Sequence, residues 1–190
     1  MKVKEVKSYL LNPGWGKNLL FVKIATDNGL VGWGECYTQS DRDKTIVTHL
    51  EHMSKYLKGR DPFEIKYFNQ IIFDDYASRR GSMEIFSALS GIEQALWDIC
   101  GKETKQPVYN LLGGPSRGKL RVYANGWYAG ALVPEDYAEK AKKTIDKGFT
   151  ALKFDPIPGP FRSIISKNNL EQSIETVRQV REAVGPNIDL

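Results

Sequence analysis

The stretch SALSGIEQALWDICGKETKQPVYNLLGG, residues 87–114, decides the fold of the first part of this chain. Apolar residues recur within it at steps of three and four, which is the period of a helix with one buried face. Gly101 stands where such a helix would end, and Pro107 fixes the turn that follows. The stretch therefore predicts one buried helix followed by an exit loop that closes at Gly114.

The residues before this helix predict a small antiparallel sheet and further helices. Three short stretches have the pattern of strands: residues 3–11, 20–26 and 30–35. A helix is expected over 41–57, another from Pro62 onward, and a break over 75–82. Three strands followed by three helices indicate an α+β domain, which we place at residues 1–118.

The pattern changes after residue 118 to alternating strands and helices. Strands are predicted over 120–125 and 149–154, and the start of a third over 187–190. One helix is predicted over 134–147, and a second begins with an apparent capping box at Asn169 and Gln172. Its apolar positions are Leu170, Ile174, Val177, Val180 and Val184. This order is typical of parallel α/β units, so residues 119–190 are predicted to begin a TIM-type (β/α) barrel and to stop in its third strand.

Composition places the chain among ordinary globular proteins. Its 190 residues are 41% hydrophobic and 26% charged, and the net charge is +4. Basic and acidic residues are mixed along the chain, which argues against nucleic acid as a partner and favours small anionic substrates only weakly. With no long apolar run and no signal peptide, we expect no membrane association and a cytoplasmic location. Cys36 and Cys100 are predicted to be reduced and buried.

Lys153 and Asp155 flank Phe154 at the end of the second predicted strand of this region. Strand alternation points both charged side chains to one side and Phe154 to the other. The working residues of parallel α/β barrels lie at these strand ends, so the pair is a candidate catalytic site. The alternative is a structural ion pair, in which Lys153 and Asp155 neutralise each other and have no catalytic role.

The segment SGIEQALWDI, followed by PVYNLLGG, resembles the end of the capping domain in the enolase superfamily, in its mandelate racemase and muconate-lactonizing branch. The resemblance implies an α+β capping domain followed by a barrel, of which this chain looks like the N-terminal half. It also implies that Lys153 neutralises the carboxylate of a substrate as an enediolate forms.

Racemases and cycloisomerases of that branch carry Lys-x-Lys at this place, and their second lysine is a base. Asp155 stands at the second position, and a carboxylate has a far lower reference pKa than an amine. The departure argues against a two-base racemase and suits dehydratases whose base lies across the barrel. Residues 121–170 look closest to dehydratases acting on gluconate or galactonate, which would let Asn125 and Trp127 contact a polyol chain; the alternative is that they only form loops.

Two loops of the capping domain usually close the barrel mouth in this family. They match residues 12–18, with Trp15 and Lys17, and residues 77–83, with Arg79 and Arg80. An arginine can hold a carboxylate through two hydrogen bonds, and a tryptophan can exclude water. The alternative for these residues is a solvated basic turn.

The family binds Mg²⁺ through three carboxylates at the ends of the third, fourth and fifth barrel strands. These ligands are expected beyond Leu190, so Asp189 is not assigned as one. His49 and His52 lie three residues apart on a predicted helix without a third ligand nearby, and we expect a surface or packing role.

The resemblance thus implies a hydro-lyase that converts an aldonic acid into a 2-keto-3-deoxy acid, as part of a longer chain and in a homo-oligomer. The present fragment alone is expected to be inactive. Two alternatives stay open: epimerisation or cycloisomerisation on the same scaffold, and a non-catalytic module that binds a partner or a sugar acid.

Overall fold

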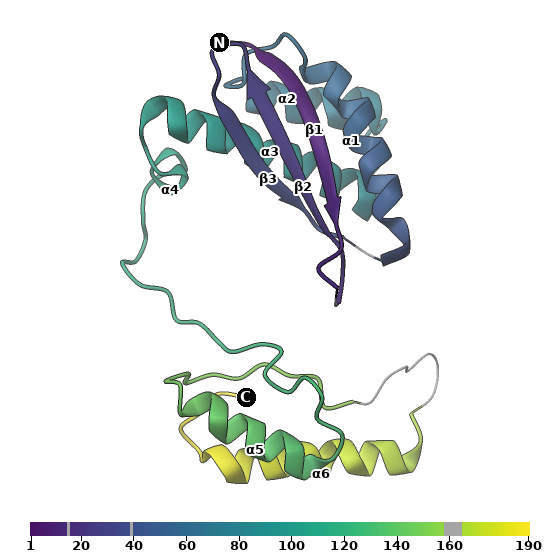
Figure 1. Ribbon diagram of the computed structural model, residues 1–190, viewed down its shortest axis with the longest axis vertical. Helices are drawn as coiled ribbons and strands as arrows, with labels where there is room; N and C mark the ends of the chain where they lie inside the picture. Colours follow the sequence, from purple (N-terminus) through teal and green to yellow (C-terminus); the bar gives the residue numbers. More distant parts are fainter. Residues whose placement is uncertain (15, 39, 158–164) are drawn as a thin grey trace. The chain divides into compact units, whose positions relative to one another are not determined.

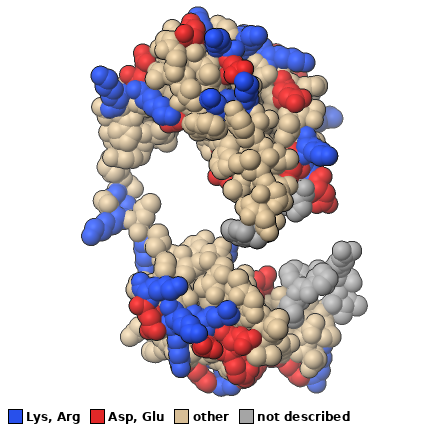
Figure 2. All heavy atoms as spheres, viewed as in Figure 1, with Lys and Arg blue, Asp and Glu red and all other residues tan. Residues whose placement is uncertain are grey.

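A computed structural model describes residues 1–14, 16–38, 40–157 and 165–190 (Figure 1). The chain forms two compact units, Met1–Ser116 and Arg117–Leu190. We call them the first and the second unit and describe each by itself. No helix among the described residues is long and apolar enough to cross a membrane. On the face shown in Figure 2, basic and acidic side chains are interspersed over the helices of the second unit.

The first unit begins with a three-stranded antiparallel meander, as predicted. Strand β1 spans Val3–Leu11, β2 spans Leu19–Thr26 and β3 spans Val31–Cys36, in the order β1-β2-β3. In β2 alternate side chains are buried, with Leu20, Val22 and Ile24 completely inaccessible. This alternation turns one face of the sheet toward the core.

Helix α3, Met83–Thr104, packs against that face (Figure 1). The predicted apolar face is confirmed, because the apolar residues that recur at steps of three and four are buried: Ala88, Leu89, Ile92, Ala95, Leu96 and Ile99. The helix approaches β3 so closely that only glycine fits at the contact. A Cβ on Gly32 would lie 2.0 Å from the carbonyl oxygen of Ala95, and one on Gly34 would lie 2.0 Å from that of Gly91. These two glycines of β3 therefore set the distance between sheet and helix.

The end of α3 differs from the prediction at Gly101. The helix continues to Thr104, and Lys105 adopts the left-handed conformation at its C-cap with φ of 55°. Gly101 is buried inside the last turn because the returning chain passes over it: a Cβ there would lie 2.9 Å from the carbonyl oxygen of Gln106. This glycine serves close packing and not helix termination. The short helix α4, Val108–Leu111, follows.

Further helices complete the first unit: η1 at Ser40–Arg42, α1 at Asp43–Leu57, α2 at Ile65–Ile71 and η2 at Ile72–Tyr76. The helix expected from Pro62 begins three residues later, because the Asp61 side chain accepts a hydrogen bond from the Phe63 amide at 3.0 Å and forms a turn. The break expected over 75–82 begins only after Tyr76, since η2 is a π-helix that continues α2.

The second unit pairs two helices with three extended segments. Helix α5 spans Pro134–Ile145 and α6 spans Lys167–Val184, and they pack against each other. The predicted strands shrink to two isolated parallel bridges, Ala124 with Leu152 and Ala151 with Asp189. The core is correspondingly small: Ala124, Ala141, Leu152 and Val180.

Helix α6 corrects two predictions. Its N-cap is Ser166, whose hydroxyl accepts a hydrogen bond from the Asn169 amide at 3.1 Å, so the capping box at Asn169 and Gln172 is wrong. Three residues of the predicted apolar face are instead exposed: Leu170 at 50%, Ile174 at 61% and Val177 at 39%. Ser173 and Thr176 are buried, because each hydroxyl donates to a carbonyl one turn earlier in the helix.

Replacing Ser166 with alanine should therefore destabilise the second unit by about 1 kcal/mol, the usual value of an N-cap hydroxyl. Replacing Asn169 with alanine should change stability by less than about 0.5 kcal/mol, since its side chain makes no cap. Urea unfolding followed by circular dichroism measures both variants. Equal losses, or a larger loss for Asn169→Ala, would contradict the assigned cap.

Both cysteines are free and buried, as predicted. Burial raises the pKa of the Cys36 thiol to about 12 and that of Cys100 to about 11. A raised pKa means that folding favours the protonated thiol, so this contribution to stability is complete at neutral pH and is lost as pH rises above the unfolded pKa near 8.5.

We expect the urea midpoint of the first unit to fall between pH 8 and pH 10.5, and to fall less steeply in Cys36→Ala. Comparing the two slopes separates the thiol from the lysines and tyrosines that titrate in the same range. Parallel slopes would show that Cys36 does not titrate in this window upon unfolding.

Candidate functional site

Lys153 lies on the side of the extended segments that the helices leave open. Its backbone amide donates to the carbonyl of Ala124 at 2.9 Å, which fixes the register of the extended segment at Lys153 against the one at Ala124. Leu152 is buried in the core, and Phe154 lies among three other aromatic rings. Because side chains alternate along an extended segment, Lys153 points away from that core. Its ammonium is exposed and lies 6.0 Å from the centre of the Tyr123 ring.

This open side forms a hollow of about 470 Å³, lined by Lys153 together with Tyr123, Ala151 and neighbouring residues. An ion pair occupies one end of it. The guanidinium of Arg121 lies 2.5 Å from the Asp189 carboxylate and donates to the carbonyl of Thr150 at 3.0 Å. Arg121 therefore links all three extended segments and keeps Asp189 engaged.

Asp155 is exposed at the end of the second segment, and one carboxylate oxygen accepts a hydrogen bond from the Ile157 amide at 3.1 Å. None of the ion pairs between described residues joins Lys153 to Asp155. The alternative, a structural ion pair between Lys153 and Asp155, is therefore absent from the described structure. The carboxylate instead shapes the turn that leaves the strand.

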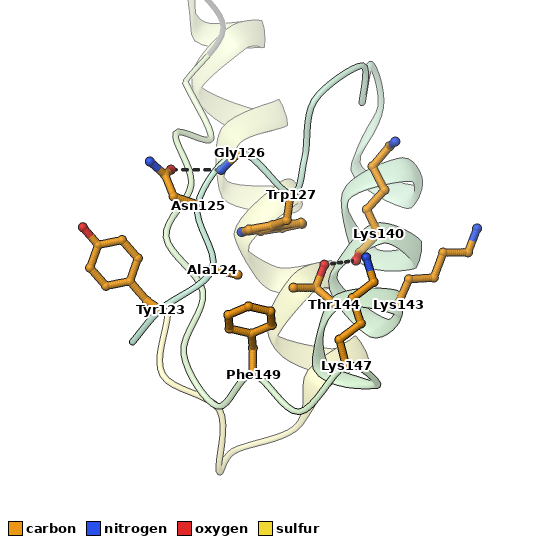
Figure 3. A pocket seen from close by; sticks show the side chains of 10 residues that line it. All are labelled: Tyr123, Ala124, Asn125, Gly126, Trp127, Lys140, Lys143, Thr144, Lys147 and Phe149. Carbon is orange, nitrogen blue, oxygen red and sulfur yellow. Dashed lines mark hydrogen bonds between the residues drawn. The ribbon is translucent and has the colours of Figure 1, made fainter. Parts of the chain in front are cut away.

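Asn125 and Trp127 follow the first extended segment and border a second hollow, of about 460 Å³, between that segment and α5 (Figure 3). The Asn125 side chain accepts from the amide of Gly126 at 3.0 Å and points away from α5 (Figure 3). The Trp127 indole donates to the backbone carbonyl of Lys153 at 3.0 Å and packs on Phe154. Trp127 thus ties its loop to the strand end that carries Lys153.

In the first unit, Lys17 is exposed and held by Tyr37. Its ammonium donates to the Tyr37 hydroxyl at 2.9 Å and lies 4.6 Å from the centre of that ring. Trp15, the other candidate of this loop, falls outside the described residues. The base of the loop is fixed by Asn18, whose amide donates to the buried Asp43 carboxylate at 2.8 Å.

Tyr37 and Asp43 were missed in the sequence. Asp43 begins α1, where a carboxylate interacts favourably with the positive end of the helix dipole. That position at the helix start was the only signal in the sequence that could have marked this residue. Tyr37 follows β3, and its carbonyl accepts from the hydroxyl of Ser87 at 2.7 Å. These contacts join residues 20 to 50 positions apart, which local patterns do not reveal.

Arg79 and Arg80 lie in the turn between η2 and α3 and are both exposed. The Arg79 side chain donates to the Asp74 carboxylate at 3.3 Å. No hydrogen bond or ion pair of the Arg80 side chain occurs within the described part of the chain. The two neighbouring arginines are therefore not equivalent.

No group of three metal-ligating side chains lies together among the described residues. His49 and His52 pack edge-on against Tyr76, and the described acidic residues do not converge. Among the described residues, Lys153, Lys17, Arg79 and Arg80 are exposed cationic side chains, and no cluster of three metal-ligating side chains accompanies them.

The first unit, a three-stranded antiparallel sheet packed against helices, has the architecture of a capping domain. Residues 16–113 match the N-terminal domain of mandelate racemase and muconate lactonizing enzyme. The chain belongs to this family.

Three relatives extend the match to the whole chain. The chain is 38% identical to a D-gluconate/D-galactonate dehydratase of Picrophilus torridus and 37% identical to a D-gluconate dehydratase of Thermoproteus tenax, over 99% of its own length in both cases. It spans 49% and 38% of those proteins, respectively. A mandelate racemase/muconate lactonizing enzyme structure from Sulfitobacter sp. matches with a TM-score of 0.89 and 31% identity, over 100% of this chain and 52% of that one.

Proposed function

We propose that this chain is the N-terminal half of an acid-sugar dehydratase, a hydro-lyase acting on an aldonic acid such as gluconate or galactonate. The observation that supports it most strongly is the identity of 37–38%, across both units, with proteins named as dehydratases of these acids. The single lysine at the strand end, in Lys153-Phe154-Asp155, agrees with that assignment and not with a two-base racemase.

The reaction removes the proton from the carbon next to the substrate carboxylate, and the electrons of that bond move into the carboxyl group as an enediolate. Lys153 stabilises the added negative charge, since a fixed ammonium group interacts more strongly with the doubly charged enediolate than with the ground state. The hydroxyl of the next carbon then leaves and takes up a proton to become water. The resulting enol tautomerises to a 2-keto-3-deoxy acid.

Asp155 does not provide the base in this proposal. A base near neutral pH would need a buried carboxylate or one with a negative neighbour, whereas Asp155 is exposed and accepts a hydrogen bond from the Ile157 amide. The α-proton is taken by a group outside the described residues. We propose that Asp155, Asn125 and Trp127 shape the strand end around Lys153.

Magnesium is part of the proposal for the complete protein only. The described residues do not fit a Mg²⁺ site, because no three oxygen ligands converge and Asp189 is engaged by Arg121. The first unit is proposed to supply substrate-binding groups from its two loops, Lys17, Arg79 and Arg80.

The decisive experiment incubates the complete protein and Mg²⁺ with a panel of aldonic and aldaric acids in D₂O. A keto acid that forms a semicarbazone supports dehydration. Deuterium at the α-carbon without loss of water would replace this proposal with epimerisation. Saturable binding without either product would favour a non-catalytic module.

A further inference from the structure

The turn that carries Arg79 and Arg80 has an unusual backbone. It begins at the π-helix η2, whose last hydrogen bond runs from the Ala77 amide to the Ile72 carbonyl at 2.8 Å. Ser78 and Arg79 then both adopt left-handed conformations, with φ of 49° and 60°. Two consecutive left-handed residues that are not glycine are unfavourable and persist only where the surroundings fix them. Such fixed strain is a feature of functional turns.

The surroundings that fix this turn come from α1. The Tyr76 hydroxyl lies 2.6 Å from Nδ1 of His49. The Tyr76 ring also meets three rings edge-on, with centroid distances of 5.8 Å to His49, 6.4 Å to His52 and 6.3 Å to Tyr56. Burial raises the pKa of Tyr76 and lowers that of His49, so a protonated hydroxyl faces a neutral ring. Tyr76 and Nδ1 of His49 therefore share one hydrogen bond, whose donor is set by the tautomer of the ring.

Arg79 is used inside the turn itself. Its amide donates to the carbonyl of Phe73 at 2.8 Å, and its side chain donates to Asp74. The side-chain amide of Gln70 in turn donates to the Asp74 carboxylate at 2.6 Å. These contacts fasten Arg79 to the end of α2 and to η2.

The side chain of Arg80 is exposed and takes no part in the contacts that stabilise the turn. Its amide donates to the carbonyl of Ala77 at 2.9 Å, which places the residue at the exit of the turn. Gly81 follows and lies against the exposed Phe86 ring, from which a Cβ at this position would be 2.0 Å away. Within the described residues the Arg80 guanidinium keeps all its donors available.

We infer that His49 and Tyr76 are positioning residues that lock this turn, so that Arg80 grips the substrate anion while Arg79 serves as an anchor. The inference rests on the proposed function for the identity of the anion. His49, for which the sequence predicted a surface or packing role, thereby gains a role at the binding loop.

The first test does not depend on activity. Trypsin cleaves after Arg79 and Arg80 once the turn opens. Tyr76→Phe keeps the ring but removes the hydroxyl that shares the hydrogen bond with His49, and we expect cleavage at these bonds to become about threefold to tenfold faster, as for the loss of one hydrogen bond. His49→Leu should act alike, His49→Gln should restore part of the protection, and Tyr109→Phe, at an exposed tyrosine on α4, should have no effect. Unchanged cleavage in Tyr76→Phe would overturn the lock.

The second test measures kinetics of the complete enzyme with its sugar acid. Arg80→Gln should raise KM by about tenfold to a hundredfold, the range for a hydrogen bond to a charged group. Arg79→Gln and Tyr76→Phe should raise KM by less, with kcat less affected than KM. An increase for Arg79→Gln equal to that for Arg80→Gln would overturn the division of roles. If no acid turns over, the proposed function fails and the role of Arg80 fails with it, while the cleavage rates still decide the lock.

Discussion

Lys153→Met in the complete protein should lower kcat for sugar-acid dehydration by about a thousandfold, with little change in KM. The expected size follows from the loss of one fixed charge that stabilises an oxyanion in the transition state, which costs on the order of 10²–10³ in rate. Methionine keeps the length of the side chain and removes only the ammonium group. Steady-state kinetics, with the keto acid measured as its semicarbazone, gives both constants.

The matched control is Lys142→Met, which removes an exposed ammonium from α5 of the same unit. Its kcat should stay within about twofold of the parent, since its side chain lies on the helix surface and makes no assigned contact with the substrate. If the Lys153 variant turned over substrate as fast as this control, the stabilising role assigned to Lys153 would have to be abandoned.

Gly34→Ala should unfold or severely destabilise the first unit, by about 3 kcal/mol or more. The added Cβ would lie 2.0 Å from the carbonyl oxygen of Gly91 and 2.9 Å from the amide nitrogen of Ala95, and both atoms belong to the backbone of α3. No rotamer relieves such a clash, so the sheet and the helix must separate and lose packing over the core. Urea unfolding followed by far-ultraviolet circular dichroism measures the loss.

Gly118→Ala is the control, because nothing lies within 4 Å of a Cβ at that position and its φ is not in the left-handed region. Its unfolding midpoint should equal that of the parent within error. A Gly34→Ala variant with the stability of this control would mean that the close approach of β3 and α3 does not exist in solution.

The sequence predicted the first unit well because its pattern is local and repeated. The helix around Ile92 and the strand around Val22 both bury a regular face, and each period is visible within one element. Errors arose where a single residue had two possible uses. Gly101 was assigned to a helix end but allows close packing, and Asn169 was assigned to a cap that Ser166 provides.

The second unit was harder because its segments depend on partners that are distant in the sequence. The extended segment at Ala124 meets Leu152 only in one bridge, so alternation indicated the direction of Lys153 but overestimated the length of the strands. The same limit applies to the candidate sites. Residue types indicated Lys17 and Arg79, whereas Tyr37 and the contact of His49 with Tyr76 arise only when remote parts of the chain meet.

The contact between the Trp127 indole and the Lys153 carbonyl has a practical consequence. Trp127 is the only tryptophan in the second unit, since the other three are Trp15, Trp33 and Trp97. A chain in which those three are replaced by phenylalanine would carry one intrinsic fluorophore, hydrogen-bonded to the backbone of the proposed catalytic lysine. Its emission maximum would shift to the red when that strand end opens to water, and would thus report on the integrity of the site without any added label.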